Sequence, residues 1–470
     1  MTPATPLSPP PLPDRVPEIV DGLPHPFARA QIDSCTPSFA LTSGGAVVST
    51  DAWSGRQLAK PTSAGWEPVT AGRAWHRRPR WAGDELICDV HTDPIDEHST
   101  SRSIAAAGSP IDQPCPFKVT RTARLVRRGA SGSVVCEDGG SETVLEHVVE
   151  IGPWVSRDEL LVIKENWPSR ELYRWHLGTG RLDAVFETGR RVVTDVHRSG
   201  ELVGLSRTST GQPRRLELLE RGELRRTVHR VEDDPTDGPR PGPVRALCVD
   251  GPVCGLPCLH YEPRGRPRGT IVLLHGGPHG VNLATWSPLA DSLVLAGWRL
   301  VLPNIRGSGV LDPRLRPPRP DRYGEDDVDD VLAVIRHFAV GKVVVGGRSY
   351  GGYLAARTAM ASPEVAAVFL LGGFLASTDL RDTRHPAVTA FLRAAGTRFA
   401  PDRRPAPVPH FLAHGGRDDR IPVDAVLAHA DDLPDGSEVV TLADEGHGVR
   451  TDPGARQAFP ALFRWLDGLG

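Results

Sequence analysis

The sequence predicts an all-β domain followed by an α/β domain with a mostly parallel sheet and helices on both faces. The chain has 470 residues, more than one compact domain usually holds. Residues 23–232 contain short apolar runs separated by Gly, Asp, Ser and Thr, which favours many short antiparallel strands. From residue 245 onward, apolar strand-like segments alternate with amphipathic ones, and this alternation is typical of βα units.

Proline-rich segments mark the expected boundaries. Residues 1–22 contain repeated prolines and lack the basic and apolar regions of a signal peptide, so a disordered arm is expected there. Residues 233–244 are too rich in Pro, Gly and Asp for the interior of a helix or strand and are predicted to be a linker. The all-β domain is therefore expected at 23–232 and the α/β domain at 245–470.

The all-β half shows weak self-similarity. Trp81-Ala-Gly-Asp-Glu-Leu-Ile resembles the stretch that begins at Trp154, and Glu201-Leu-Val-Gly-Leu follows that stretch by roughly one propeller blade. The stretches that begin at Arg170 and Gln212 each read as strand, turn, strand. Four-stranded blades of about forty residues fit this spacing, and about five would fit. A short or degenerate β-propeller is predicted, with an irregular β-sandwich as the alternative.

The elements of the α/β half follow from its apolar runs and amphipathic periodicity. The predicted strands are Thr270–Leu274, Arg299–Leu302, Lys342–Val345, Ala366–Leu371, His410–Ala413 and Glu438–Leu442, and the predicted helices are Asp326–Phe338, Tyr353–Ala361 and Val423–Leu433.

A Gly-Arg-Ser-Tyr-Gly motif at residues 347–351 is the strongest local signal. It follows a β-branched strand and precedes a helix-forming run, as in the nucleophile elbow of an α/β-hydrolase, where flanking glycines leave room for a sharp turn. The helix that begins behind Ser349 would offer backbone donors to developing negative charge. Ser349 is therefore predicted to be a nucleophile.

A serine nucleophile needs a base and an acid that orients the base. His447 lies in a glycine-rich loop just after a predicted strand, and Asp418 follows another predicted strand, with Asp419 as the competing acid. The chain order Ser, Asp, His is that of α/β-hydrolases. The loop His275-Gly-Gly-Pro-His-Gly follows a strand as well, so the backbone N–H groups of Gly277 and Tyr350 are the candidate oxyanion donors.

Composition excludes several classes of function. The formal charge of −3, from 55 basic and 58 acidic residues, argues against nucleic-acid binding. No apolar run reaches the length of a membrane span. The seven cysteines are an odd number scattered along the chain, unlike a secreted disulfide framework, so the cytoplasm is the expected compartment. Homo-oligomerisation stays open.

One cluster could be taken for a metal site. Cys248, Cys254, Cys258 and His260 lie close together in the sequence but lack the CxxC pairs of structural zinc sites. Because the stretch is apolar and strand-like, buried thiols are predicted instead. No metal and no cofactor is expected in this chain.

Five motifs occur in order along the α/β half: His275-Gly-Gly-Pro-His, Pro303-Asn-Ile-Arg-Gly-Ser-Gly, Gly347-Arg-Ser-Tyr-Gly-Gly-Tyr, His414-Gly-Gly-Arg-Asp-Asp-Arg-Ile-Pro and Glu445-Gly-His-Gly. Together they resemble the prolyl oligopeptidase family of serine peptidases, in particular its acylaminoacyl-peptidase-like and dipeptidyl-peptidase-like branches. The resemblance implies a β-propeller that stands over the active site and admits short peptides.

The same resemblance assigns roles to individual residues. It implies Ser349 as nucleophile, Asp418 as the acid and His447 as the base. It also implies that Arg420 contacts a substrate carbonyl or carboxylate, and a surface Arg in a turn is the alternative. Three features depart from the family: the all-β half is short, Ile305 replaces an aromatic residue, and paired glutamates that would capture a free N-terminus are not evident, so dipeptidyl release is not expected.

Three functional hypotheses follow. The first is a peptidase or amidase that acts on short peptides or acylated amino acids. The second is an esterase, thioesterase or acyl-transferring cyclase that acts on a small or modified-peptide metabolite, because the same triad serves these reactions. The third is an interaction protein in which the propeller binds a partner and the hydrolase half is a non-catalytic scaffold.

Overall fold

The computed structural model divides into two compact units, and each is described separately. The first unit comprises residues from Ile32–Asp237 together with Leu283–Ser287, and the second comprises residues from Gly238–Asn282 and Pro288–Gly470. The predicted arm at residues 1–22 and nearly all of the predicted linker lie outside the described residues. The structure describes residues 39–42, 45–53, 55–62, 65–70, 75–82, 85–91, 100–103, 122–128, 131–138, 141–186, 192–199, 202–210, 212–220, 223–230, 244–252, 255–309, 315–383, 385–395, 405–449 and 452–469.

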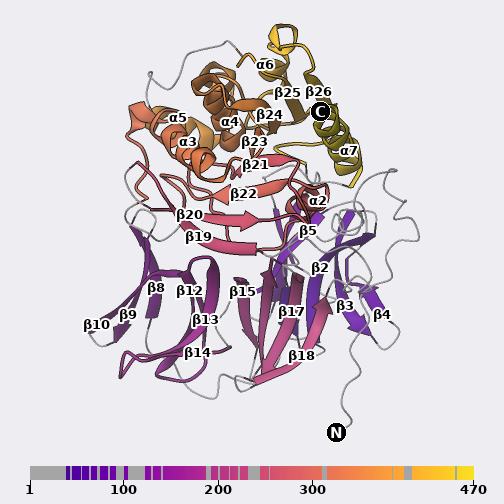
Figure 1. Cartoon of the computed structure of the whole chain (residues 1–470). Coiled ribbons are helices and arrows are strands. Elements are labelled where there is room, and N and C mark those ends of the chain that lie inside the picture. Colours follow the sequence, from indigo (N-terminus) through magenta and orange to yellow (C-terminus); the bar gives the residue numbers. More distant parts are fainter. Residues whose placement is uncertain are drawn as a thin grey trace. The chain divides into compact units, whose positions relative to one another are not determined.

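The described strands of the first unit form five consecutive antiparallel meanders in four sheets, because a parallel bridge between β13 and β15 joins the last two meanders in one eight-stranded sheet (Figure 1). The first three are β1–β4 (Phe39–Thr42, Gly45–Trp53, Gly55–Thr62, Gly65–Pro68), β5–β7 (Trp75–Ala82, Glu85–His91, Thr100–Ser103) and β8–β10 (Thr122–Arg128, Ser131–Asp138, Ser141–Glu146). The other two are β11–β14 (Val148–Trp154, Glu159–Asn166, Ser169–His176, Leu182–Ala184) and β15–β18 (Val192–Ser199, Leu202–Ser209, Gln212–Glu220, Glu223–Arg230).

The repeated sequence stretches fall on equivalent hairpins. Trp81 lies near the end of β5, Trp154 ends β11, and Leu202 of the third stretch begins β16, which pairs with β15. Each repeat therefore includes residues of the second strand of a meander. The all-β prediction is confirmed, and meanders in consecutive order are typical of propeller blades, whereas a β-sandwich connects strands across two sheets.

Strand β12 is buried on both of its faces. Leu160 and Val162 pack with Trp175 in one apolar cluster, while Leu161 and Ile163 belong to a second cluster on the opposite face. A strand exposed on one side would alternate apolar and polar residues, so the run Leu-Leu-Val-Ile has the composition expected of a sheet covered on both sides.

The second unit contains an eight-stranded sheet in the order β19-β20-β22-β21-β23-β24-β25-β26. β19 pairs antiparallel with β20, and β20 pairs antiparallel with β22, while the remaining neighbours pair in parallel. The strands are Val244–Asp250, Gly255–Tyr261, Gly269–Leu274, Arg299–Pro303, Lys342–Arg348, Val365–Leu371, His410–Gly415 and Glu438–Leu442 for β19 to β26. The predicted mostly parallel sheet is confirmed, with the two antiparallel strands at one edge.

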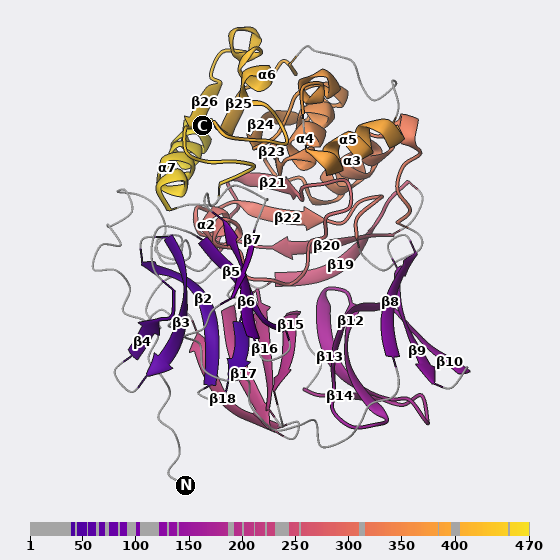
Figure 2. The ribbon, with the colours of Figure 1, turned by 180° about the vertical axis from the view of Figure 1, so that it is seen from behind.

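Helices cover both faces of this sheet (Figures 1 and 2). α2 and α7 lie on one side, whereas α3 and α4 pack against each other on the other side. The helices are α2 (Pro288–Leu295), α3 (Asp326–Phe338), α4 (Tyr350–Ala361), α5 (Pro386–Ala395), α6 (Val423–Leu427) and α7 (Asp452–Gly468). The α/β prediction is confirmed in both its sheet and its helical layers.

Two local predictions were wrong. The helix expected to run to Leu433 ends at Leu427, because Pro434 disfavours helical backbone at Leu433, which is extended, and His429 is buried against Asp379. The second concerns the predicted buried thiols. Cys258 is buried as predicted, and burial raises the pKa of its thiol to about 12. Cys248, in contrast, is exposed, since it lies on the edge strand β19. Cys254 lies outside the described residues.

Candidate active site

Ser349 sits at a sharp turn between β23 and α4. Its backbone has φ 52° and ψ −122°, a conformation that is strained for any residue other than glycine. The turn needs the flanking glycines, because a Cβ on Gly347 would lie 2.2 Å from the Gly351 backbone and one on Gly351 would lie 2.5 Å from the carbonyl oxygen of His275. The backbone N–H of Ser349 donates to the carbonyl of Leu371 on β24 at 3.2 Å.

Asp418 and His447 lie in the loops after β25 and β26 and contact each other. His447 Nδ1 lies 2.9 Å from Asp418 Oδ2 and 3.2 Å from Oδ1, so this nitrogen carries the proton and Nε2 is left as the acceptor. Asp418 Oδ1 also accepts the backbone N–H groups of Arg420 and Ile421, both at 2.9 Å. The carboxylate is therefore held on both of its oxygens, and its orientation toward the imidazole is fixed.

A further histidine supports the same carboxylate. His414 Nε2 lies 3.3 Å from Asp418 Oδ2 and 2.9 Å from the carbonyl oxygen of Ile421. Burial raises the pKa of Asp418, but the hydrogen bonds from His414 and His447 outweigh it and hold the pKa well below its usual value. Asp418 is thus ionised at neutral pH. The role of His414 could have been suspected from its place in the same sequence motif.

This depressed pKa has a consequence for stability in acid. Because the folded protein binds the Asp418 proton more weakly than the unfolded chain does, the ionised Asp418 carboxylate stabilises the fold above the unfolded pKa near 3.8, and its contribution falls as the pH drops through lower values. We expect the difference in unfolding free energy between wild type and Asp418→Asn to shrink from pH 7 to pH 3. Urea unfolding at both pH values checks this, and a difference that grows in acid would contradict it.

The loop after β21 lies beside the nucleophile turn. A Cβ built on Gly276 would lie 3.5 Å from the Cβ of Ser349, and Gly277 has φ 57°, which favours glycine. Tyr350 is the first residue of α4, directly after Ser349, and its side chain is buried. The structure therefore brings the two predicted oxyanion segments next to Ser349. His275 in the same loop contacts Ser308, and burial lowers the pKa of His275 to about 4, which keeps it neutral.

The loops that carry the acid and the base lie close to this turn. A Cβ on Gly448 would lie 3.3 Å from Nη2 of Arg348, and one on Gly372 would lie 3.1 Å from the backbone N of Gly448 and 3.9 Å from Asp418 Oδ2. Parallel strands end at the same edge of a sheet, and β23, β24 and β25 are neighbours. The residues after these strands therefore gather at one edge.

The remaining predicted residues have different surroundings. Asp419 is exposed, and it is Asp418 that contacts His447. Arg420 is half-buried and supports Asp418 through its backbone N–H. Arg348, which sequence reasoning did not single out, is exposed directly before Ser349. Among the described residues, no group of three His, Cys, Asp or Glu side chains is arranged to hold a metal ion, and no helix is long and apolar enough to span a membrane.

Comparison with known proteins identifies the fold. Residues 269–406 match the family model of the α/β hydrolase fold. Acylamino-acid-releasing enzyme 2 of Oryza sativa subsp. japonica is 26% identical over 228 residues, which cover 42% of this chain and 30% of that enzyme. The acylamino-acid-releasing enzyme of Sus scrofa is 28% identical over 138 residues, 26% of this chain and 19% of that enzyme. The chain thus matches less than a third of the length of these relatives.

Solved structures resemble almost the whole chain. The acylaminoacyl peptidase of Pyrococcus horikoshii has a TM-score of 0.64 at 14% identity, with 93% of this chain and 88% of that chain covered. A puromycin-hydrolyzing peptidase of Mycobacterium tuberculosis has a TM-score of 0.59 at 17% identity, with 92% and 79% covered. At these identities the likeness concerns the fold. The chain therefore carries an α/β-hydrolase domain, and the comparisons confirm the resemblance to the prolyl oligopeptidase family that its motifs predict.

Proposed function

We propose that this chain is a serine hydrolase that cleaves short peptides or acylated amino acids through an acyl-enzyme on Ser349. The observation that carries the proposal is the Asp418–His447 pair, because the loop that carries His447 approaches the strained turn of Ser349. A strained serine at the start of a helix, next to an imidazole held by an ionised carboxylate, is the arrangement that serine nucleophiles need. Relatives named for releasing acylated amino acids agree with this substrate class.

The proposed reaction begins with attack of Ser349 Oγ on the substrate carbonyl carbon. His447 Nε2 takes the hydroxyl proton, and Asp418 stabilises the imidazolium through Nδ1. The backbone N–H groups of Gly277 and Tyr350 stabilise the negative charge on the tetrahedral intermediate. When the C–N bond breaks, His447 returns the proton to the leaving amine. Breakage of this bond leaves the acyl group as an ester on Ser349 Oγ. A water molecule, deprotonated by His447, then attacks the carbonyl carbon of this ester. His447 returns the proton to Ser349 Oγ as the carboxylic acid leaves.

The five meanders of the first unit support a short β-propeller as part of this proposal, since each has the antiparallel order of a blade. The cytoplasm remains the proposed compartment, because the scattered cysteines do not form the framework of a secreted protein. Arg420 is proposed to contact the substrate through its guanidinium. The proposed partner is the small peptide or acyl-amino-acid substrate.

Acyl-amino-acid anilides, unblocked amino-acid anilides and short-chain p-nitrophenyl esters separate the candidate activities. We expect turnover of the acylated anilides, because cleavage of an amide requires the proton that His447 delivers to the leaving amine. The matched control is the same protein labelled by a fluorophosphonate, with the labelled peptide identified by mass spectrometry. Turnover of esters alone would favour an esterase or acyl transferase. An enzyme that reacts with none of these compounds and is not labelled at Ser349 would favour the scaffold.

A further inference from the structure

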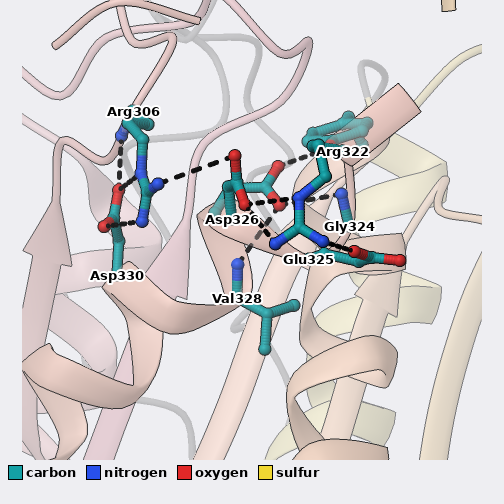
Figure 3. Close-up of polar contacts among 9 residues, drawn as sticks. Arg306, Arg322, Gly324, Glu325, Asp326, Val328 and Asp330 are labelled. Atoms are coloured by element: carbon teal, nitrogen blue, oxygen red, sulfur yellow. Dashed lines mark hydrogen bonds and ion pairs between the residues drawn. The ribbon is translucent and has the colours of Figure 1, made fainter. Parts of the chain in front are cut away.

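The first two turns of α3 carry three carboxylates that reach two different loops of the site. Asp326 and Asp330 face Arg306 in the loop after β22, and Asp326 also pairs with Arg322 (Figure 3). Asp327 reaches Tyr350 at the start of α4. Acidic residues in the first turn of a helix are favourable for the helix dipole, but that effect alone does not explain burial of Asp327 and Asp330.

Asp330 holds Arg306 by a bidentate contact. Asp330 Oδ1 accepts Nη2 of Arg306 at 2.7 Å, while Oδ2 accepts Nε at 3.0 Å and the backbone N–H of Arg306 at 2.9 Å. The Asp330 carboxylate is fully buried, and the Arg306 side chain is 12% exposed. Such a fork-shaped pair fixes both position and direction of the loop to which Arg306 belongs.

The loop after β22 is hydrogen-bonded in turn to the segment that contains Gly277. Ser308 Oγ lies 2.7 Å from His275 Nε2, and His279 Nδ1 lies 2.9 Å from the carbonyl oxygen of Gly307. The backbone N–H of Gly309 donates to the carbonyl of Gly280 at 2.8 Å. These contacts lie on both sides of Gly277, so the position of its N–H depends on the loop that Asp330 holds.

The next residues extend the same connection. The backbone N–H of Asn282 donates to Asn304 Oδ1 at 2.7 Å, and Asn304 Nδ2 donates to the carbonyl of Asn282 at 3.0 Å. Asn304 is fully buried and is the first residue after β22, so the start of this loop is also fixed to the segment that carries Gly277.

Asp327 holds the other oxyanion segment. The hydroxyl of Tyr350 donates to Asp327 Oδ2, while Oδ1 accepts the backbone N–H groups of Gly324 at 2.8 Å and Val328 at 3.2 Å. Asp327 and Tyr350 are 1% and 5% exposed. Because the backbone N–H of Tyr350 is the proposed second donor, its anchored side chain limits how far that donor can move.

We propose that α3 is a positioning element for the reaction, in which Asp330 and Asp327 set the separation of the two oxyanion donors from one rigid helix. This inference rests on the proposed hydrolase function, since the donors matter only for a nucleophilic Ser349. Burying two carboxylates on one helix costs free energy that apolar residues would not, so a purely structural role explains them poorly. Burial raises the pKa of Asp327 to about 6, despite the hydrogen bond from Tyr350.

The test compares Asp330→Asn, Asp327→Ala and Asp327→Asn with Asp329→Asn, which removes an exposed carboxylate from the same helix. We expect Asp330→Asn and Asp327→Ala to lower kcat about 10- to 100-fold, with KM changed less than about twofold, because displaced donors weaken the transition state. Asp327→Asn keeps polar atoms that can bond to Tyr350 and to the backbone of Gly324, so it should retain most of the activity that Asp327→Ala loses. Asp329→Asn should behave as wild type.

Two further measurements extend the test, and the first of them does not depend on the acyl substrate. The rate of fluorophosphonate labelling at Ser349 should fall in parallel with kcat, and Tyr350→Phe combined with Asp327→Ala should lose less than the sum of the single losses in log kcat. Arg306→Lys, which keeps the charge but loses the fork, carries the test if Asp330→Asn does not fold. Variants with a lower Tm but wild-type kcat and labelling would overturn the proposal. If the variants label more slowly but the wild type cleaves no acyl substrate, the positioning role of α3 would be supported and the proposed function would be overturned.

Discussion

Ser349→Gly is expected to abolish hydrolysis and at the same time to make the protein more stable. Removal of the nucleophile should lower kcat by a factor on the order of 10⁵ to 10⁶. The strained backbone of Ser349, with φ 52°, costs about 1–3 kcal/mol, and glycine adopts this conformation without strain. The side chain of Ser349 makes no capping hydrogen bond to α4, so none is lost. Thermal unfolding and anilide turnover measure the two effects.

The gain in stability is limited by the entropy of the unfolded chain. Glycine loses about 0.5–1 kcal/mol more on folding than alanine does, so a net gain of about 1 kcal/mol is expected. Ser349→Ala is the matched control, because it removes the hydroxyl but keeps the Cβ and hence the strain. It should lose activity without a rise in Tm. Equal Tm values for the two variants would mean that the turn stores no strain, and retained turnover would refute the nucleophile.

Asp418→Asn should lower kcat by about 10³- to 10⁴-fold, with little change in KM. An amide at this position can offer its NH₂ group to His447, which favours the tautomer with the proton on Nε2 and removes the base that Ser349 needs. Loss of the negative charge also removes the stabilisation of the imidazolium. Initial rates over a range of substrate concentrations, at several pH values from 5 to 9, give kcat and KM and measure the effect.

Asp419→Asn is the control for this variant. It changes the same charge one residue away, but Asp419 is exposed, whereas both oxygens of Asp418 contact His447. We expect Asp419→Asn to keep kcat within about twofold of the wild type. If the two variants exchanged their effects, the acid would have to be reassigned to Asp419.

The sequence carried most of the information on the second unit. The motif Gly-Arg-Ser-Tyr-Gly predicted the turn at Ser349 because close backbone approach leaves no room for a Cβ at residues 347 and 351. The strands before Asp418 and His447 were evident from short apolar runs, and the chain order Ser, Asp, His indicated an α/β-hydrolase. The choice between Asp418 and Asp419 could not be derived from spacing, since both follow the same strand.

Contacts between distant segments were beyond sequence reasoning. Asp327 and Tyr350 are 23 residues apart, and Arg306 and Asp330 are 24 apart. The amphipathic pattern predicted the bounds of α3 correctly, yet it treats every acidic residue as a solvent-facing one. Asp327 and Asp330 are buried because their partners come from other elements, and hydrophobic periodicity contains no information on such pairs. The exposure of Cys248 was missed for a related reason, since an edge strand cannot be told from a central one by its own residues.

The glycines around Ser349 also limit which substitutions this turn can accept. A Cβ on Gly346 would lie 2.0 Å from the ring of Phe369, and those on Gly347 and Gly351 would meet backbone. Substitution of any of these three glycines would therefore displace the turn, whatever substrate is under selection. A library for directed evolution is therefore best designed to leave Gly346, Gly347 and Gly351 unchanged.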